Sequence, residues 1–333
     1  EGVLAWLSMT HDGDESDKND LYILKNGKRI NLTAQWDNTI FSYRWSNDGK
    51  RIYLIAPTQG TEQLFVVDVY SKNTTPIQLT QGVFDVNSIV GQAGDQLVVI
   101  RTDMNHAAEL YTISLKEKKK EYLALTQLSH FNDEAYRQIA QCPIKERIIK
   151  TTDGKDMHAW VIYPPDFDPN KKYPTLLYCQ GGPQSIVSQF YSFRWNFQLM
   201  TSQGYIVIAP NRRGLPGFGV KWNAEISGDW GGQPMRDYLS AIDDIAKEPY
   251  VDKERLGAIG ASYGGYSIYY LAGIHQKRFK TFIAHCGVFN LQSMYGTTEE
   301  LFFNNNEIGG AYWDKKNAVA QKSYKEFNPI EKI

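Results

Sequence analysis

Residues 257–266 read GAIGASYGGY, and this stretch decides the fold of the second half of the chain. The apolar run RLGAIGAS (255–262) leads into YGGYSIYYLAGIHQ (263–276), which reads as a helix. A serine at such a junction, with Gly260 before it and Gly264 after it, has the pattern of a nucleophile elbow. The serine there takes a strained conformation, and larger side chains at the glycine positions would collide. Ser262 is therefore the predicted nucleophile, and a plain glycine-rich bend is the alternative.

Continuous apolar runs alternate with helical segments around this turn. The runs are TLLYC (175–179), YIVIAP (205–210), RLGAIGAS (255–262) and TFIAHC (281–286), and YSFRWNFQLMTSQ (191–203) and PMRDYLSAIDDIAKE (234–248) read as helices. Strands that are apolar along their whole length are buried on both faces. The pattern over residues 139–333 therefore predicts a parallel sheet with helices on both faces.

The first 138 residues repeat themselves. WSNDGKRIYLIAPTQGTEQLFVVDV (45–69) aligns with GQAGDQLVVIRTDMNHAAELYTISL (91–115), with Ile52 over Val98 and Leu64 over Leu110. A period of roughly 40 to 50 residues with about four strands per unit is typical of β-propeller blades. About three blades fit, whereas propellers usually close with at least about four, so the sequence predicts part of a propeller. An ordinary antiparallel sandwich is the alternative.

Composition and charge argue against several classes of function. Lys plus Arg (36) balance Asp plus Glu (37), which disfavours a nucleic-acid partner. No apolar stretch approaches the roughly 18 residues of a membrane span. The three cysteines are odd in number, far apart and without metal-ligand spacing, so they form neither a disulfide scaffold nor a zinc site. No metal or cofactor is expected. The acidic stretch HDGDESDKND (11–20) lacks a glycine and a terminal glutamate at the spacing of a calcium loop, which favours a solvated propeller hairpin.

Two backbone N–H groups are predicted to stabilise an oxyanion beside Ser262. Tyr263 follows the serine at the helix N-terminus, where the helix dipole favours negative charge. The second donor, taken as Gly182, is expected in Gln180-Gly181-Gly182-Pro183, whose glycines let the backbone approach a substrate closely. A plain turn between strand and helix is the alternative.

The chain resembles the prolyl oligopeptidase (S9) family of serine peptidases, in its dipeptidyl-peptidase-5 and acylaminoacyl-peptidase branch. The resemblance is carried by GASYGGY (260–266), QGGP (180–183), NRRGLPGFGVKW (211–222) and AWLSMTHDGDESDKNDLYI (5–23). Gln180 stands where histidine is common and Leu215 where serine is common. The resemblance implies propeller blades over residues 1–138 and an α/β-hydrolase domain over residues 139–333.

The family's catalytic order is Ser, then Asp or Glu, then His. The resemblance implies that the Asp follows the next β-strand and that the His comes later still. We therefore expect the sequence to lack both residues and the N-terminal blades, and to be inactive as it stands. His285, at the end of TFIAHC, is the alternative base, against a core histidine; His275 is expected to face away.

The resemblance implies a serine exopeptidase that releases dipeptides from short peptides through an acyl-enzyme. Arg213 is expected to bind substrate, with a structural ion pair as the alternative. Phe289 and Tyr263 are expected to form an apolar pocket for a small or hydrophobic P1 residue, with ordinary core as the alternative. The rival functions are an acylaminoacyl-peptidase or esterase, and a non-catalytic propeller-bearing binding protein. A periplasmic or secreted location is expected, with the cytoplasm as the alternative, and a homodimer is left open.

Overall fold

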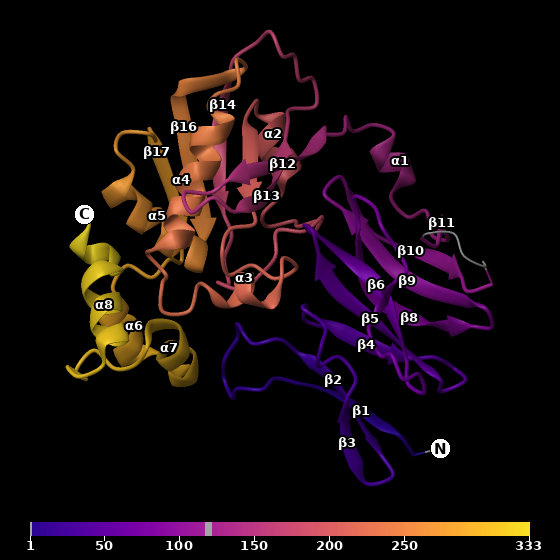
Figure 1. Ribbon diagram of the computed structural model, residues 1–333. Coiled ribbons are helices and arrows are strands. Elements are labelled where there is room, and N and C mark those ends of the chain that lie inside the picture. Colours follow the sequence, from indigo (N-terminus) through magenta and orange to yellow (C-terminus); the bar gives the residue numbers. More distant parts are fainter. Residues whose placement is uncertain (1, 117–121) are drawn as a thin grey trace.

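The computed structural model describes residues 2–116 and 122–333, and its first part consists of three successive antiparallel sheets (Figure 1). The first sheet contains β1 (Leu4–Ser8), β2 (Asp20–Lys25) and β3 (Lys28–Asn31) in that order. The second contains β4 (Ser42–Trp45), β5 (Arg51–Thr58), β6 (Thr61–Asp68) and β7 (Ile77–Gln78). The third contains β8 (Asp85–Ala93), β9 (Gln96–Asp103), β10 (His106–Ser114) and β11 (Leu125–Gln127).

The sequence repeat maps onto equivalent strands of the second and third sheets. Ile52 and Val98 lie on β5 and β9, and Leu64 and Leu110 lie on β6 and β10. Strand β5 is buried on both sides, because side chains alternate across a strand. Its residues Ile52, Leu54 and Ala56 pack with the first sheet, and Tyr53 and Ile55 pack with the third. Sheets stacked in this way bury a continuous core between neighbouring units.

The second part is a six-stranded sheet in the order β12-β13-β15-β14-β16-β17. Its strands are β12 (Ile144–Lys150), β13 (Asp156–Ile162), β14 (Tyr173–Cys179), β15 (Ile206–Pro210), β16 (Val251–Ala261) and β17 (Thr281–His285). The four strands that read as continuous apolar runs pair in parallel. The hairpin β12–β13 joins them antiparallel through β15, so the sheet is mixed.

Helices cover both faces of this sheet. On one face Leu177 and Ile208 pack in a core with α4 (Gln233–Ile245) and α5 (Tyr263–Ile274). On the other face Leu176 and Val207 pack with Phe197 of α2 (Phe197–Ser202). The remaining helices are α1 (Asp133–Tyr136), α3 (Val220–Ala224), α6 (Leu291–Thr297), α7 (Leu301–Ile308) and α8 (Ala318–Glu326), of which the last three gather near the C-terminus (Figure 1).

The β5–β6 hairpin docks directly on the α/β unit. The Trp160 indole N–H donates to the Gly60 carbonyl at 2.9 Å, and the Gln59 N–H donates to the Gly217 carbonyl at 3.2 Å. Gly60 has a φ of 77°, and a Cβ there would lie 2.3 Å from the His158 ring. The second sheet is therefore held against the unit that carries Ser262.

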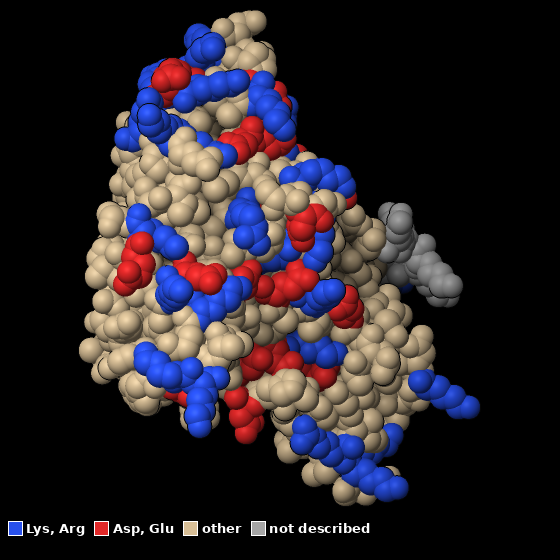
Figure 2. Space-filling model, turned by 60° about the vertical axis from the view of Figure 1, so that its left-hand side comes forward, with Lys and Arg blue, Asp and Glu red and all other residues tan. Residues whose placement is uncertain are grey.

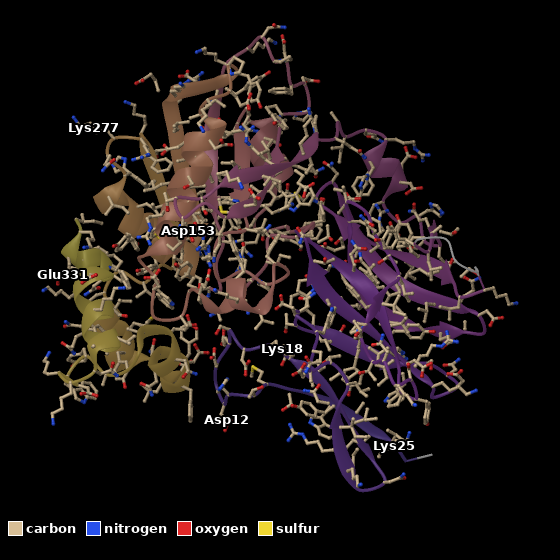
Figure 3. The ribbon with its side chains drawn as sticks, in the orientation of Figure 1. Asp12, Lys18, Lys25, Asp153, Lys277 and Glu331 are labelled. Carbon is tan, nitrogen blue, oxygen red and sulfur yellow. The ribbon has the colours of Figure 1, made fainter. Side chains whose placement is uncertain are left out.

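Two carboxylates of the acidic stretch 11–20 form hydrogen bonds or ion pairs with residues of the same stretch or next to it. Asp17 accepts hydrogen bonds from the Thr10 and His11 N–H groups, both at 2.7 Å. Lys18, labelled in Figure 3, pairs with Asp20 at 3.0 Å. Figure 2 shows basic and acidic side chains interspersed over the face it presents. Among the residues described, no helix is long and apolar enough to cross a membrane.

Candidate active site

Ser262 lies on the sharp turn that the sequence predicts. It follows the last residue of β16, caps α5 and has φ 57° and ψ −122°. The turn leaves no room for side chains at the neighbouring glycines. A Cβ on Gly260 would lie 2.6 Å from the Gly264 carbonyl carbon, and one on Gly264 would lie 2.0 Å from the Cys179 oxygen. The predicted collisions are therefore real, and the serine takes a backbone conformation that residues with a Cβ rarely adopt.

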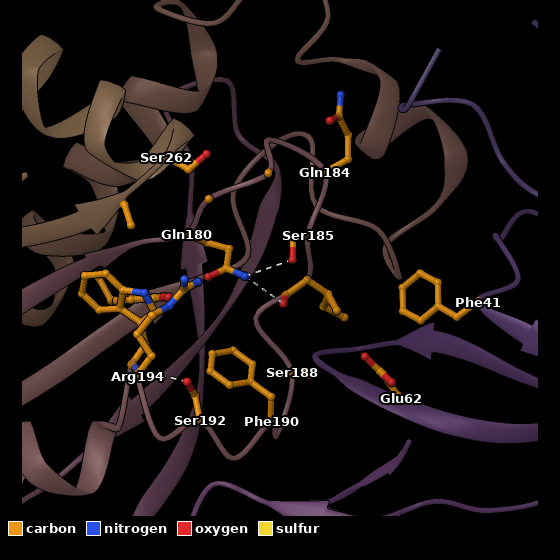
Figure 4. A pocket seen from close by; sticks show the side chains of 16 residues that line it. Phe41, Glu62, Gln180, Gln184, Ser185, Ser188, Phe190, Ser192, Arg194 and Ser262 are labelled. Carbon is orange, nitrogen blue, oxygen red and sulfur yellow. Dashed lines mark hydrogen bonds between the residues drawn. The ribbon is translucent and has the colours of Figure 1, made fainter. Parts of the chain in front are cut away.

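Ser262 opens into a cavity of about 590 Å³ between the second antiparallel sheet and the α/β unit (Figure 4). The second sheet contributes Glu62 of β6, and Phe41 comes from the segment just before β4. The α/β unit contributes Tyr178, Gln180, Gly181, Gly182, Gln184, Ser185, Ile186, Ser188, Phe190, Ser192, Arg194, Trp195, Ala261 and Ser262. The cavity is thus composite, with walls from both parts of the chain.

The glycine-rich loop after β14 lies against the serine. A Cβ on Gly181 would be 3.5 Å from the Ser262 Cβ, and Gly182 lines the same cavity with a φ of 111°. Within the described part of the chain, the N–H groups of Gly182 and Tyr263 donate to no protein acceptor. Two backbone donors beside a serine hydroxyl can stabilise the negative charge that develops on a carbonyl oxygen under attack.

Gln180, where the family commonly has histidine, stabilises the loop itself. Its side-chain amide donates to the Ser185 hydroxyl at 3.1 Å and to the Ile186 carbonyl at 3.4 Å (Figure 4). Both partners lie a few residues downstream in the same loop. The substitution therefore changes side-chain contacts and leaves the backbone donors in place.

Arg213 does not reach the cavity, so its expected role in substrate binding is wrong. Its buried guanidinium pairs with Asp153 at 2.7 Å, with Asp237 at 3.3 Å and with Glu225 at 3.4 Å. It also lies 4.5 Å from the centre of the Trp222 ring. Its hydrogen bonds lower the pKa of Asp153, which comes from the β12–β13 turn (Figure 3). The alternative of a structural ion pair is the correct one.

The apolar pocket expected from Phe289 and Tyr263 is also wrong. The Tyr263 ring is buried, with its hydroxyl donating to the Trp230 carbonyl at 2.8 Å. Phe289 packs edge-on against Tyr269, with ring centres 5.3 Å apart, and neither side chain lines the cavity. Tertiary packing engages both side chains elsewhere, so neither forms a wall of the cavity.

Aromatic side chains of residues 190–195 line the cavity instead. The sequence predicts a helix over 191–203, but α2 begins only at Phe197. The Asn196 side chain accepts from the Leu199 N–H at 3.0 Å and caps the helix there. The preceding segment is therefore a loop that brings Phe190 and Trp195 to the cavity. A capping asparagine is the sequence signal that could have identified this boundary.

No described histidine forms a hydrogen bond with the Ser262 hydroxyl. His285 accepts from the Ser262 N–H through its backbone carbonyl at 3.0 Å, while its ring packs near Trp195. His275 is the C-cap of α5, and burial lowers its pKa. Burial also lowers the pKa of His158, to about 4.

Glu62 is the acidic residue in the cavity, and sequence reasoning missed it. Burial and the nearby Asp85 carboxylate raise its pKa to about 8. The Asp85 side chain accepts from the Glu62 N–H at 2.8 Å, which fixes the strand position of Glu62 beside Phe41 (Figure 4). No motif marks Glu62, because its proximity to Ser262 arises only from the docking of the second sheet.

Two family models match the chain. Residues 191–333 match the prolyl oligopeptidase family, and residues 9–156 match the dipeptidyl peptidase IV (DPP IV) N-terminal region. The chain belongs to the prolyl oligopeptidase family. The assignment made from the elbow, the QGGP loop and the NRRG segment is thus confirmed, and it covers both parts of the chain.

Relatives within the prolyl oligopeptidase family match along nearly the whole chain. Dipeptidyl-peptidase 5 of Porphyromonas gingivalis is 48% identical over 323 residues, which are 96% of this chain and 46% of the relative. The acylaminoacyl peptidase of Pyrococcus horikoshii has a TM-score of 0.83 at 20% identity, covering 98% of this chain and 49% of the other. Dipeptidyl peptidase 4 of P. gingivalis has a TM-score of 0.74 at 21% identity, covering 99% and 44%.

At those identities the two solved structures show the fold alone. The chain spans about half the length of the curated relatives that it matches.

Proposed function

We propose that this protein is a serine exopeptidase that releases dipeptides from the free N-termini of short peptides. The observation that carries the proposal is the single cavity shared by Ser262 and Glu62. A peptide with its scissile carbonyl at the serine could direct its N-terminus into the same cavity. An α-ammonium group there needs a carboxylate partner, because an unpaired charge in a partly buried site is costly.

In the proposed reaction the Ser262 hydroxyl oxygen attacks the carbonyl carbon of the second residue. The N–H groups of Gly182 and Tyr263 hold the resulting oxyanion, and its collapse breaks the peptide bond and leaves a dipeptidyl ester on the serine. Water then hydrolyses this ester. The proton transfers need a general base, for which the family order implies a histidine oriented by an aspartate.

Glu62 distinguishes the proposed dipeptide-releasing activity from that of an acylaminoacyl-peptidase. That alternative is considered because the chain has the fold of an acylaminoacyl peptidase. A blocked N-terminus carries no positive charge and would gain nothing from a carboxylate. An esterase would likewise not need one. We therefore propose that Glu62 selects peptides with a free α-amine.

Replacing Glu62 with glutamine is expected to lower kcat/KM for an Ala-Ala reporter amide roughly 10- to 100-fold in the full-length protein. The variant keeps the size of the side chain and removes its charge, so an N-acetyl-Ala reporter should change by less than about threefold. Glu254→Gln is the matched control, because its side chain is 83% exposed on β16, away from the cavity. Equal losses for both reporters would contradict the assignment of Glu62 as the amine-binding group.

The pH profile gives an independent check on Glu62. With a pKa of about 8, its carboxyl group is largely protonated below that pH and gains the required charge as the pH rises. The substrate α-amine loses its proton at a pKa of about 8. The ratio of kcat/KM for free and acetylated reporters should therefore rise from pH 6, peak near pH 8 and fall above it. The titration of the general base affects both reporters equally and therefore does not change this ratio. In Glu62→Gln the increase of the ratio between pH 6 and pH 8 should be absent.

Residues 1–333 alone are expected to be inactive, because no described histidine contacts the Ser262 hydroxyl. The purified segment should hydrolyse an Ala-Ala reporter no faster than its Ser262→Ala variant. The full-length protein provides the reference rate. Turnover by the segment at a comparable rate would mean that it contains its own base, and His285 would be the first residue to replace.

Phe41, Phe190 and Trp195 make part of the cavity wall apolar, and this part supports a preference for small or hydrophobic P1 residues. We further propose that the three antiparallel sheets are blades of a propeller that admits only short or unfolded peptides.

A periplasmic or secreted location and a homodimer are part of the proposal, with the cytoplasm as the alternative location. A failure of Ser262 to react with a fluorophosphonate would favour the non-catalytic binding protein.

A further inference from the structure

Arg212 is a fully buried cation that has no carboxylate partner among residues 2–116 and 122–333. It is the largest of the fully buried side chains, and none of the ion pairs among the described residues includes it. Its neighbour Arg213 pairs with three carboxylates. Burying a guanidinium is costly unless its N–H groups are satisfied. The groups that accept hydrogen bonds from the Arg212 guanidinium therefore indicate the role of this residue.

The guanidinium of Arg212 holds both ends of the glycine-rich loop. Its Nη2 donates to the Gln180 carbonyl at 3.3 Å, and its Nη1 donates to the Pro183 carbonyl at 3.0 Å. These two carbonyls flank Gly181 and Gly182. A rigid planar fork that grips both ends restricts the loop more than two separate donors would.

This grip orients the peptide planes of the loop. The C=O and N–H groups of a trans peptide point in opposite directions. No peptide bond of the described chain is cis, so the Gly181 N–H points away from Arg212 when the Gln180 carbonyl points toward it. Gly182 is one peptide further along and lines the cavity. The peptide that carries the Gly182 N–H lies between the two carbonyls that Arg212 holds, so the guanidinium restricts its rotation from both sides.

The same guanidinium also contacts the second proposed donor residue. It lies 4.4 Å from the centre of the Tyr263 ring, a favourable cation–π distance. Tyr238 completes the arrangement, since its hydroxyl accepts from Arg212 Nε at 3.1 Å and donates to the Gln180 carbonyl at 3.4 Å. One buried side chain thus joins the glycine loop to the first residue of α5.

We propose that Arg212 is a positioning residue that fixes the two oxyanion donors, Gly182 and Tyr263, relative to each other. The inference rests on the proposed function and deepens it. Arg212 is outside the cavity lining and acts through the loop carbonyls and the Tyr263 ring. Donors aligned in advance stabilise the transition state without reorganising during the reaction. Loss of that alignment should therefore lower kcat and leave substrate binding nearly unchanged.

The test compares Arg212→Lys with Arg213→Lys in the full-length protein. Lysine keeps the charge but loses the fork, so kcat for an Ala-Ala reporter should fall roughly 10- to 100-fold with KM within about threefold. The inhibition constant of a dipeptide boronate, which forms a tetrahedral adduct on the serine, should rise by the same factor as kcat falls. Arg213→Lys should lower the melting temperature and leave the kcat and boronate values of the folded enzyme within about threefold.

Tyr238→Phe keeps the proposal testable if Arg212→Lys does not fold. It removes one hydroxyl and keeps the guanidinium, so kcat and boronate affinity should both fall about 3- to 10-fold. An unchanged kcat, or a fall in kcat without weaker boronate binding, would overturn the inference while the proposed function stands. A wild-type protein without peptidase activity would instead overturn the proposed function and this inference with it.

Discussion

Replacing Ser262 with alanine should lower kcat for an Ala-Ala reporter at least about 1000-fold in the full-length protein. The variant loses the only atom proposed to bond to the substrate carbonyl. It should keep the wild-type melting temperature within a few degrees, because removing one hydroxyl from the edge of a cavity leaves no large void. Steady-state rates and the loss of fluorophosphonate labelling measure the effect.

Ser202→Ala is the matched control for this experiment. Ser202 ends α2, and its hydroxyl donates to the Leu199 carbonyl within the same exposed turn. It should retain full activity and full labelling. Activity of Ser262→Ala above about a thousandth of the wild-type rate would rule out Ser262 as the nucleophile.

Replacing Gly264 with alanine is expected to destabilise the fold by about 3 kcal/mol or more. The new methyl group would lie 2.0 Å from the Cys179 oxygen and 3.0 Å from its carbonyl carbon. Both are backbone atoms at the end of the central strand β14, so the clash cannot be relieved by a change of side-chain rotamer. Equilibrium unfolding in urea measures the loss, and poor recovery of soluble protein would accompany it.

Gly296→Ala provides the comparison for Gly264→Ala. Gly296 lies in helix α6, and a Cβ there would meet no atom within 4 Å apart from its chain neighbours and its own helix backbone. Alanine in that helix should leave stability unchanged or raise it by up to about 1 kcal/mol. If both variants unfolded at the same urea concentration, the close approach of α5 and β14 would not be a constraint on the fold.

Local sequence patterns were sufficient for the elbow and the parallel strands. The glycines at 260 and 264 mark the tight strand–helix turn because only glycine avoids the collisions there. The four apolar runs predict buried parallel strands, because a strand that is buried on both faces is apolar at every successive residue. The repeat before residue 138 likewise falls on equivalent strands of neighbouring sheets.

The walls of the cavity could not be predicted in the same way. Glu62 reaches the site only because the second sheet docks through Gly60 and Trp160, a contact without a local pattern. The family resemblance favoured Arg213 near the site, and Phe289 follows the fourth apolar strand, but Arg213 forms ion pairs and Phe289 packs on Tyr269 instead. Neither a family resemblance nor a position after a strand determines which way a side chain points.

The strained backbone conformation of Ser262 affects how stabilised variants of this protein should be selected. Its φ of 57° with ψ of −122° is a sparsely populated conformation that costs about 1 to 3 kcal/mol for a residue with a Cβ. Glycine would adopt the same angles with little strain. A campaign that ranks variants of this protein by heat resistance alone would therefore favour glycine at this position. It would select against the residue on which the proposed chemistry depends.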